Sequence, residues 1–256
     1  MSRILATMSV AVVLGCGEVA VAQPQEPNFE QTPLATGLGA ITDMTWATDQ
    51  SNTLFVTVKG GALRVVRDGA LQAANVATVS PVYTNSECGL LGVAVHPSFA
   101  SNGFVYVFVT ETSSTQRIYR YTVTESAGNL TGSSKTQIGP DLPTRGVNHD
   151  GGAIVIGPDN LIYFGVGNLA NSNNVGGDGT AGEFTSLGSK IGRMDLNGNA
   201  VSTDPYYNAA DGITAADYIF SRGWRNPYGL TFQPGTGALW VLEVGDSWEH
   251  IFISPL

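Results

Sequence analysis

Short apolar segments recur along this chain and alternate with polar turns. Four copies of one order can be traced, in which an apolar strand, a turn, a second apolar strand, a polar loop and a third strand follow one another. This pattern predicts β-strands rather than helices. The predicted strands are Ile41–Ala47, Leu54–Val58 and Leu63–Arg67; Leu91–Val95, Val105–Thr110 and Arg117–Val123; Ala153–Ile156, Leu161–Val166 and Ile191–Asp195; and Gly229–Phe232, Leu239–Glu243 and His250–Ile253.

The turns indicate that each copy folds as one antiparallel sheet. Pro97, Pro158 and Pro234 follow the first predicted strand of the second, third and fourth copies. Proline fixes φ in such turns, and the neighbouring Asn or Gly positions accept positive φ. One small sheet cannot bury both of its faces, so we expect the copies to stack around an axis as the blades of a β-propeller. The alternative is a β-sandwich, whose turns recur every ~8 to 12 residues without the longer repeat.

Composition agrees with an all-β fold and argues against several kinds of partner. The 256 residues include 32 Gly and 12 Pro, and only 13% are charged, which suits short strands joined by tight turns. The net charge is −9, and the 12 Lys and Arg residues form no cluster. Binding to nucleic acid or to anionic lipid is therefore not expected.

The N-terminus predicts an exported protein. Arg3 precedes an apolar run from Ile4 to Leu14, and Ala20-Val21-Ala22 supplies small residues for cleavage. We expect a signal peptide over residues 1–22, a polar linker over residues 23–33 and a propeller over residues 34–256. No later segment approaches the ~20 apolar residues of a membrane span, so the mature chain is expected in the periplasm or outside the cell.

The two cysteines of the chain bear on this prediction. Cys16 ends a stretch that loosely resembles a lipoprotein box, and lipid anchoring there is the alternative to cleavage after Ala22. Cleavage after Ala22 leaves Cys88 alone, so no internal disulfide is predicted. We interpret Cys88 as buried filler rather than as a nucleophile.

His149 is the leading candidate for a catalytic residue. It lies in Asn148-His149-Asp150-Gly151-Gly152, just before the first strand of the third copy, where a propeller places its loops near the central channel. An imidazole can take a proton from a substrate hydroxyl, and Asn148 or Asp150 can orient it. On spacing alone, a histidine satisfied within its loop is the simpler interpretation.

The equivalent loop of the fourth copy carries two guanidinium groups and two aromatic rings. Its sequence is Arg222-Gly223-Trp224-Arg225-Asn226-Pro227-Tyr228-Gly229. Arginine can hold a planar carboxylate in a bidentate fork, and the rings can stack on a flat ligand. The alternative is that Arg225 ties neighbouring loops together by bonding backbone carbonyls.

Oxygen donors suited to calcium follow in two places. Glu243-Val244-Gly245-Asp246 closes a strand of the fourth copy, and Asp178 lies in a glycine-rich loop. Asp195-Leu196-Asn197-Gly198-Asn199 is interpreted as a β-turn, because Tyr206 stands where a calcium loop needs a bidentate Glu. The chain has no phosphate-binding glycine loop, no hydrolase elbow and no zinc spacing, which disfavours those chemistries.

Three motifs in order resemble the glucose/sorbosone dehydrogenase family. They are Glu87-Cys88-Gly89-Leu90-Leu91-Gly92-Val93-Ala94-Val95-His96-Pro97, Asn148 to Gly152 with Gly157-Pro158-Asp159, and Trp224 to Gly229. The resemblance implies a six-bladed propeller that uses pyrroloquinoline quinone (PQQ) and calcium to oxidise an aldose to its lactone. Since the fourth copy ends at Leu256, we expect about four blades of a propeller truncated on its C-terminal side.

The resemblance also implies roles for individual residues. His149 matches the base that takes the proton of the anomeric hydroxyl, while Arg225 and Asn226 match residues facing the quinone. Gly245 and Asp246 match the region that gives backbone oxygens to calcium. On the substrate side, Glu87 stands where glucose-oxidising members use a neutral amide, and Asn148 replaces their acidic residue.

Two alternatives to an enzyme remain at this level. An exported propeller without catalysis could bind glycans or a partner protein through its loops, since fold does not fix function. An inactive fragment with open sheet edges is the other. The enzyme interpretation requires a sugar substrate and an electron acceptor, whose identities the sequence does not give, and it leaves the oligomeric state open.

Overall fold

The structure is a computed structural model that describes residues 32–49, 51–169 and 184–254. The chain divides into two units, Met1–Leu34 and Ala35–Leu256, and the description below concerns the second. The predicted signal peptide, most of the predicted linker and Asp178 lie outside the described residues. No helix within the described ranges is long and apolar enough to cross a membrane.

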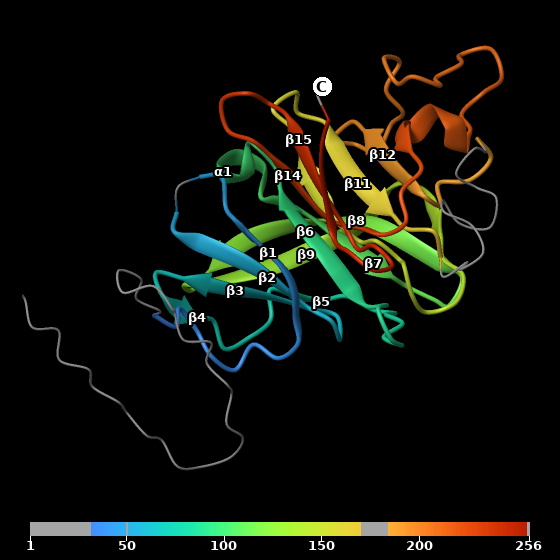
Figure 1. Cartoon of the computed structure of the whole chain (residues 1–256). Coiled ribbons are helices and arrows are strands. Elements are labelled where there is room, and N and C mark those ends of the chain that lie inside the picture. The colour runs from blue at the N-terminus through green and yellow to red at the C-terminus, as the bar shows by residue number, and fades with distance from the viewer. Residues whose placement is uncertain (1–31, 50, 170–183, 255–256) are drawn as a thin grey trace, which may run out of the picture. The chain divides into compact units, whose positions relative to one another are not determined.

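Four antiparallel sheets follow one another along the chain (Figure 1). The first contains β1 (Ile41–Trp46), β2 (Thr53–Val58), β3 (Ala62–Arg67), β4 (Ala70–Leu71) and β5 (Ala77–Thr78); the second β6 (Leu90–Val95), β7 (Phe104–Thr110), β8 (Thr115–Ser126) and β9 (Asn129–Pro143); the third β10 (Ile154–Ile156), β11 (Ile162–Val166), β12 (Lys190–Met194) and β13 (Ile219–Arg222); the fourth β14 (Pro227–Phe232), β15 (Leu239–Glu243) and β16 (His250–Ser254). The described helices are short: α1 (Phe99–Asn102) and η2 (Ala215–Tyr218). The all-β prediction and the arrangement as four propeller blades are confirmed.

Every predicted strand is present, but the outer strands β4, β5, β9 and β13 were not predicted. β9 shows the reason. It carries a long polar and largely exposed sequence, so it lacks the apolar alternation of a half-buried strand. It forms because β8 offers a partner for pairing from Thr115 to Ser126.

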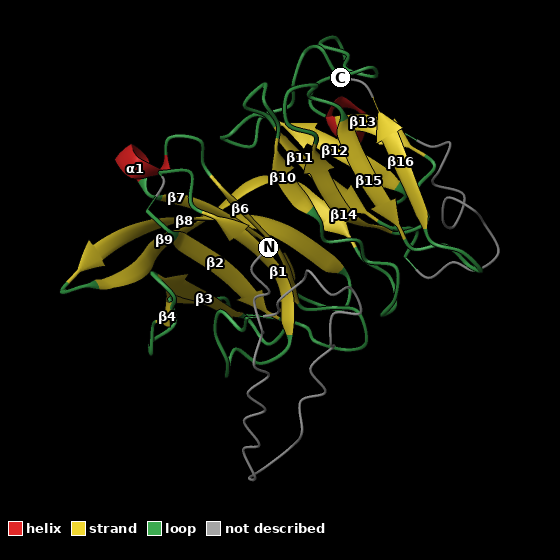
Figure 2. Ribbon diagram, turned by 60° about the vertical axis from the view of Figure 1, so that its left-hand side comes forward, coloured by secondary structure: helices red, strands yellow, loops and turns green. Residues whose placement is uncertain are grey.

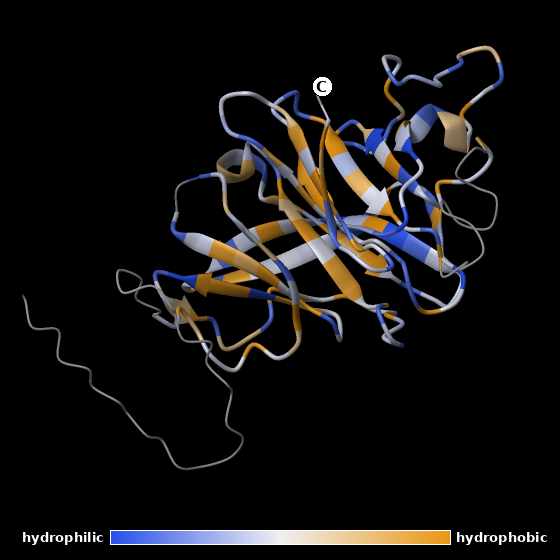
Figure 3. Ribbon diagram, viewed as in Figure 1, coloured by the Kyte–Doolittle hydropathy of each residue, from blue (hydrophilic) through white to orange (hydrophobic). Residues whose placement is uncertain are grey.

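Apolar residues on both faces of the inner sheets hold neighbouring sheets together. In the second sheet, Val93 and Val107 pack in one core cluster with Phe55 and Leu63 of the first sheet. Tyr106, Phe108 and Ile118 pack in another cluster with Ile162 and Phe164 of the third sheet. Figure 3 shows the apolar residues concentrated along strands such as β2 and β6. Figure 2 shows the third and fourth sheets side by side, and a smaller cluster around Tyr163, Leu239 and Val241 joins them.

The first strands of the four sheets line one cavity. It has a volume of about 400 Å³ and is bounded by residues of β1, β6, β10 and β14. The backbones approach so closely that a Cβ added at Gly92 of β6 would lie 2.3 Å from the carbonyl oxygen of Gly152. The loops that precede these strands are thereby brought to the same end of the four sheets.

The fourth sheet keeps apolar side chains in contact with water. Tyr228, Leu242, Ile251 and Ile253 are 51%, 45%, 64% and 56% exposed. Leu239 and Val241, which alternate with Leu242 on β15, are fully buried against the third sheet. Among the described residues, therefore, one face of this sheet is packed and the other is open.

Candidate active site

His149 lies in the loop between β9 and β10, at the end of the sheets where the preceding loops meet. Its backbone has a φ of 59°, a left-handed conformation that costs a residue other than glycine about 1 to 2 kcal/mol. The next residues pack tightly, because a Cβ added at Gly151 would lie 2.4 Å from the carbonyl oxygen of Gly165. Gly151 also lines the cavity between the first strands. The loop therefore holds His149 close to that cavity in a conformation that its surroundings must stabilise.

The imidazole of His149 is oriented by Asn168, which follows β11. Its Nδ1 lies 2.6 Å from Asn168 Oδ1, and Asn168 is only 3% exposed. An amide oxygen accepts a hydrogen bond and does not donate one, so Nδ1 carries the proton in this contact. In that tautomer the lone pair of the neutral ring is on Nε2, and this atom can serve as a base.

Glu87 connects this loop with the fourth sheet. Its Oε2 accepts a hydrogen bond of 2.5 Å from the backbone N–H of His149 and a longer one of 3.4 Å from Nδ2 of Asn226. The Oδ1 of Asn226 accepts a hydrogen bond of 3.0 Å from the backbone N–H of Gly151. Three loops, one before each of β6, β10 and β14, are thus joined by these side chains.

Asn148 and Asn226 differ in what they offer to a ligand. Asn226 is only 2% exposed, and both ends of its amide are engaged within the protein. Asn148 is half-buried, and its Oδ1 accepts a hydrogen bond from the hydroxyl of Ser86. The predicted quinone contact by Asn226 and the predicted substrate contact by Asn148 stay predictions.

Arg225 ties the fourth-sheet loop to the end of β15. Its backbone N–H donates to Glu243 Oε1 at 2.5 Å, and Nη1 donates to the carbonyl oxygen of Val244 at 2.8 Å. Its Nη2 pairs with Asp246 at 2.6 Å, and the Asp246 side chain is 78% exposed. The contact with Val244 fits the interpretation in which Arg225 binds backbone carbonyls. The pairing with an exposed carboxylate also shows that the guanidinium can reach an anionic group.

The stretch predicted to hold calcium is occupied by these contacts. Val244 gives its carbonyl oxygen to Arg225, Asp246 gives a carboxylate oxygen to the same side chain, and the N–H of Gly245 donates to Glu249. The described part of the chain contains no group of three or more His, Cys, Asp or Glu side chains placed to hold a metal. The predicted calcium contact by Gly245 and Asp246 stays a prediction.

The sequence missed Asn168, which no motif marks. It is close to His149 because the end of β11 meets the loop before β10, and its backbone N–H also donates to the carbonyl oxygen of Arg225 at 2.7 Å. Its only signal in the sequence is its position directly after an apolar strand, where residues at the end of a sheet often contribute to sites.

Asp43 places a carboxyl group in the cavity itself. Burial raises its pKa, while hydrogen bonds from the backbone N–H groups of Val93 and Met44 oppose the rise. The bond from Val93 joins the second sheet to the first. We therefore interpret Asp43 as part of the frame of the cavity.

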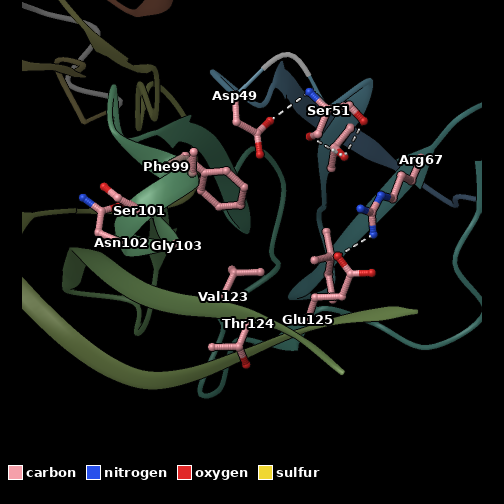
Figure 4. A pocket seen from close by; sticks show the side chains of 13 residues that line it. Asp49, Ser51, Arg67, Phe99, Ser101, Asn102, Gly103, Val123, Thr124 and Glu125 are labelled. Atoms are coloured by element: carbon pink, nitrogen blue, oxygen red, sulfur yellow. Dashed lines mark hydrogen bonds and ion pairs between the residues drawn. The ribbon is translucent and has the colours of Figure 1, made fainter. Parts of the chain in front are cut away.

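A second cavity of about 290 Å³ lies between the first two sheets, beside α1 (Figure 4). Arg67 pairs with Glu125 at 2.9 Å, and Asp49 accepts a hydrogen bond from the N–H of Ser51. Arg67 and Glu125 thus satisfy each other and Asp49 is engaged by the backbone, so these three charged groups have partners within the protein.

Comparison with known proteins identifies the same family as the motifs. The family model for Glucose / Sorbosone dehydrogenase matches residues 40–249. Quinoprotein glucose dehydrogenase B of Acinetobacter calcoaceticus is 27% identical over 251 residues, which cover 88% of this chain and 50% of that protein. An uncharacterized protein of Synechocystis is 29% identical over 89% of this chain and 57% of its own length.

Solved structures agree with the sequence relatives. The PQQ-bound aldose sugar dehydrogenase of Streptomyces coelicolor matches with a TM-score of 0.71 and 28% identity, over 87% of this chain and 62% of that chain. The present chain thus spans about half the length of the curated relatives that it matches.

Proposed function

The chain belongs to the glucose/sorbosone dehydrogenase family, and from this premise we propose that it contributes to PQQ-dependent oxidation of an aldose at its anomeric carbon. The observation that carries the proposal is the pair formed by His149 and Asn168, which leaves Nε2 of the imidazole as a base in the loop whose Gly151 lines the cavity. The names of the related quinoprotein and PQQ-bound enzymes support the cofactor class.

In this proposal, His149 removes the proton of the anomeric hydroxyl through Nε2. Asn168 holds the ring in the required tautomer by accepting a hydrogen bond from Nδ1–H. Glu87 fixes the backbone of His149, and its position beside the loop makes it the expected substrate contact. The sugar loses two electrons and two protons and becomes a lactone. General base catalysis of this kind contributes about 10²- to 10⁴-fold to a rate.

The quinone, when bound, supplies a two-electron acceptor for the hydride that leaves the anomeric carbon. Among the described residues, Arg225 fits such a group, because a guanidinium pairs well with carboxylate oxygens. Asp246 already shows this pairing, and its exposed carboxylate is a weak competitor. Calcium stays a prediction that the proposed mechanism does not use.

Export and the reoxidation partner belong to the same proposal. A periplasmic or extracellular location follows from the N-terminal pattern and is consistent with the described helices, none of which could cross a membrane. A soluble electron acceptor would then complete the cycle, and an artificial dye can replace it in an assay.

The test is quinone retention followed by sugar-dependent reduction. The chain is mixed with PQQ, with and without calcium, and the bound quinone and dye reduction by a panel of aldoses are measured. His149→Ala should lower turnover at least 100-fold and leave quinone retention intact. His96→Gln is the matched control, because His96 follows β6 and bonds Ser98 within its own turn. A folded chain that retains no quinone under either condition contradicts the proposal.

A further inference from the structure

Beneath His149 lies a cluster of buried polar side chains, which we define as Asp150, Thr144, Gln116 and Cys88. All four are nearly inaccessible to water, at 1%, 6%, 0% and 0% exposure. They come from three segments of the chain, because Asp150 and Thr144 share the loop between β9 and β10. Asp150 directly follows His149, Thr144 follows β9, Gln116 lies on β8, and Cys88 precedes β6.

Asp150 is the acceptor at the centre of this cluster. Its Oδ1 accepts hydrogen bonds from the hydroxyl of Thr144 and from Nε2 of Gln116, the latter at 3.1 Å. Its Oδ2 accepts from the thiol of Cys88 at 3.2 Å. The same Nε2 of Gln116 also donates to the backbone carbonyl of Asp150 at 3.0 Å. The residue after His149 is therefore held at both its side chain and its backbone.

These bonds anchor the loop to the second sheet. Gln116 belongs to β8, which pairs along its length with β7 and β9, and its side chain can move little in a fully buried site. His149 needs such an anchor, since its left-handed backbone is unfavourable without outside contacts. Glu87 fixes its N–H, Asn168 fixes its ring, and its carbonyl oxygen accepts a hydrogen bond of 3.2 Å from the N–H of Leu169. The Asp150 cluster adds an anchor directly after the residue, before the bond from the N–H of Gly151 to Asn226.

We propose that Asp150 is a positioning residue for His149: the buried carboxylate of Asp150 ties the middle of the loop to Gln116, to Cys88 and to Thr144 at the start of the same loop, and so holds the imidazole in place against Asn168. The Cys88 thiol serves as a hydrogen-bond donor in this arrangement. Among the described residues no Lys or Arg forms an ion pair with Asp150, so neutral donors alone satisfy its carboxylate. The kinetic part of this inference rests on the proposed function, whereas its structural part does not.

Two substitutions separate anchoring from general stability. Asp150→Ala removes the carboxylate that accepts the side-chain hydrogen bonds of Thr144, Gln116 and Cys88. Asp150→Asn keeps an oxygen for Thr144 and Gln116 and places an NH₂ group against the sulfur of Cys88. The matched control is Asp217→Ala, because Asp217 is also fully buried and accepts three hydrogen bonds, from Asn208 and Thr214, at the far end of the third sheet.

The first measurement uses the chain without cofactor and follows hydrogen–deuterium exchange of the peptide that contains His149. Asp150→Ala should speed exchange of this peptide at least 10-fold, while Asp150→Asn and Asp217→Ala should change it less than about threefold. Each variant is measured at the same number of degrees below its own melting temperature, so that a general loss of stability affects all variants equally. Equal exchange in the Asp150→Ala and Asp217→Ala proteins would overturn the inference.

The second measurement is the rate at which sugar reduces the bound quinone, together with quinone affinity. Asp150→Ala should lower this rate about 100-fold, the size expected for a misplacement of ~1 Å, with the quinone Kd unchanged. Asp150→Asn should recover most of the loss, and Asp217→Ala should show none. An unchanged rate in Asp150→Ala overturns the inference. If the unsubstituted chain reduces no quinone, the proposed function fails instead, and hydrogen exchange alone decides the anchoring role.

Discussion

The bond between His149 and Asn168 gives the sharpest test of the candidate site. Asn168→Leu preserves most of the side-chain volume and removes the acceptor that lies 2.6 Å from Nδ1. The backbone N–H of Asn168 still donates to the carbonyl of Arg225, so the connection between the two loops survives the substitution. The change therefore acts mainly on the imidazole.

The expected size of the effect follows from the burial of this bond. A neutral hydrogen bond contributes about 1 kcal/mol net, and a buried donor left unsatisfied costs up to about 3 kcal/mol. Asn168 is 3% exposed while His149 is half-buried, so we expect the loss of stabilising free energy to lie between these limits. Since 1.4 kcal/mol corresponds to a factor of 10, the rate of quinone reduction by sugar should fall about 5- to 100-fold. Asn168→Asp, which keeps an acceptor at this place, should retain a rate close to that of the unsubstituted chain.

The assay is stopped-flow reduction of the bound quinone at saturating sugar, with quinone affinity measured in parallel. Asn197→Ala is the control. Asn197 is an exposed turn residue after β12 that accepts a hydrogen bond from Arg120 of β8, and this contact is far from His149. If Asn168→Leu keeps its rate within twofold while His149→Ala abolishes it, the Nδ1 bond does not select the reactive tautomer. The orientation of the ring would then depend on other contacts.

Three further predictions concern a thiol, the cofactor side and stability. Because burial raises the pKa of the Cys88 thiol to about 12, the folded chain should resist iodoacetamide at about pH 9, and mass spectrometry should find this cysteine labelled only after unfolding in urea. Asp246→Asn should leave quinone affinity equal or raise it up to about threefold, whereas Arg225→Met should lower it about 10- to 100-fold in the same absorbance titration. Asp204→Ala leaves the buried Arg193 without the carboxylate 2.5 Å away and should cost about 3 to 5 kcal/mol in urea unfolding. A cost below about 1 kcal/mol would show that water satisfies the guanidinium.

The inner strands could be predicted because they are apolar and regularly spaced. β6 and β11 are buried at every position, and both were assigned from the sequence. β9 and β13 could not be assigned in the same way. β9 is largely polar, and β13 follows a long polar connection after β12, so both depend on pairing with a neighbour that already exists.

The sequence predicted which loops form the candidate site but not all the side chains that meet there. His149 and Asn226 could be assigned because short motifs mark the loops before the first strands of two copies. Asn168 could not, since it lies 19 residues from His149 in the sequence and meets it only through the pairing of β10 with β11. The buried cluster around Asp150 has the same origin, because Gln116 reaches it from another sheet.

The position of the site follows from the repeat. Glu87, His149 and Asn226 each lie a few residues before the first strand of their sheets, so stacking of the sheets brings them together without any long insertion. The contacts that orient His149 come from Glu87 before β6 and from Asn168 and Leu169 after β11. Among the described residues, Arg225 is the main candidate for contact with the quinone. The orientation of His149 and the retention of the quinone therefore depend on different contacts. Hydrogen exchange at His149 and quinone binding, measured separately, distinguish a chain that only positions the base from one that also binds the cofactor.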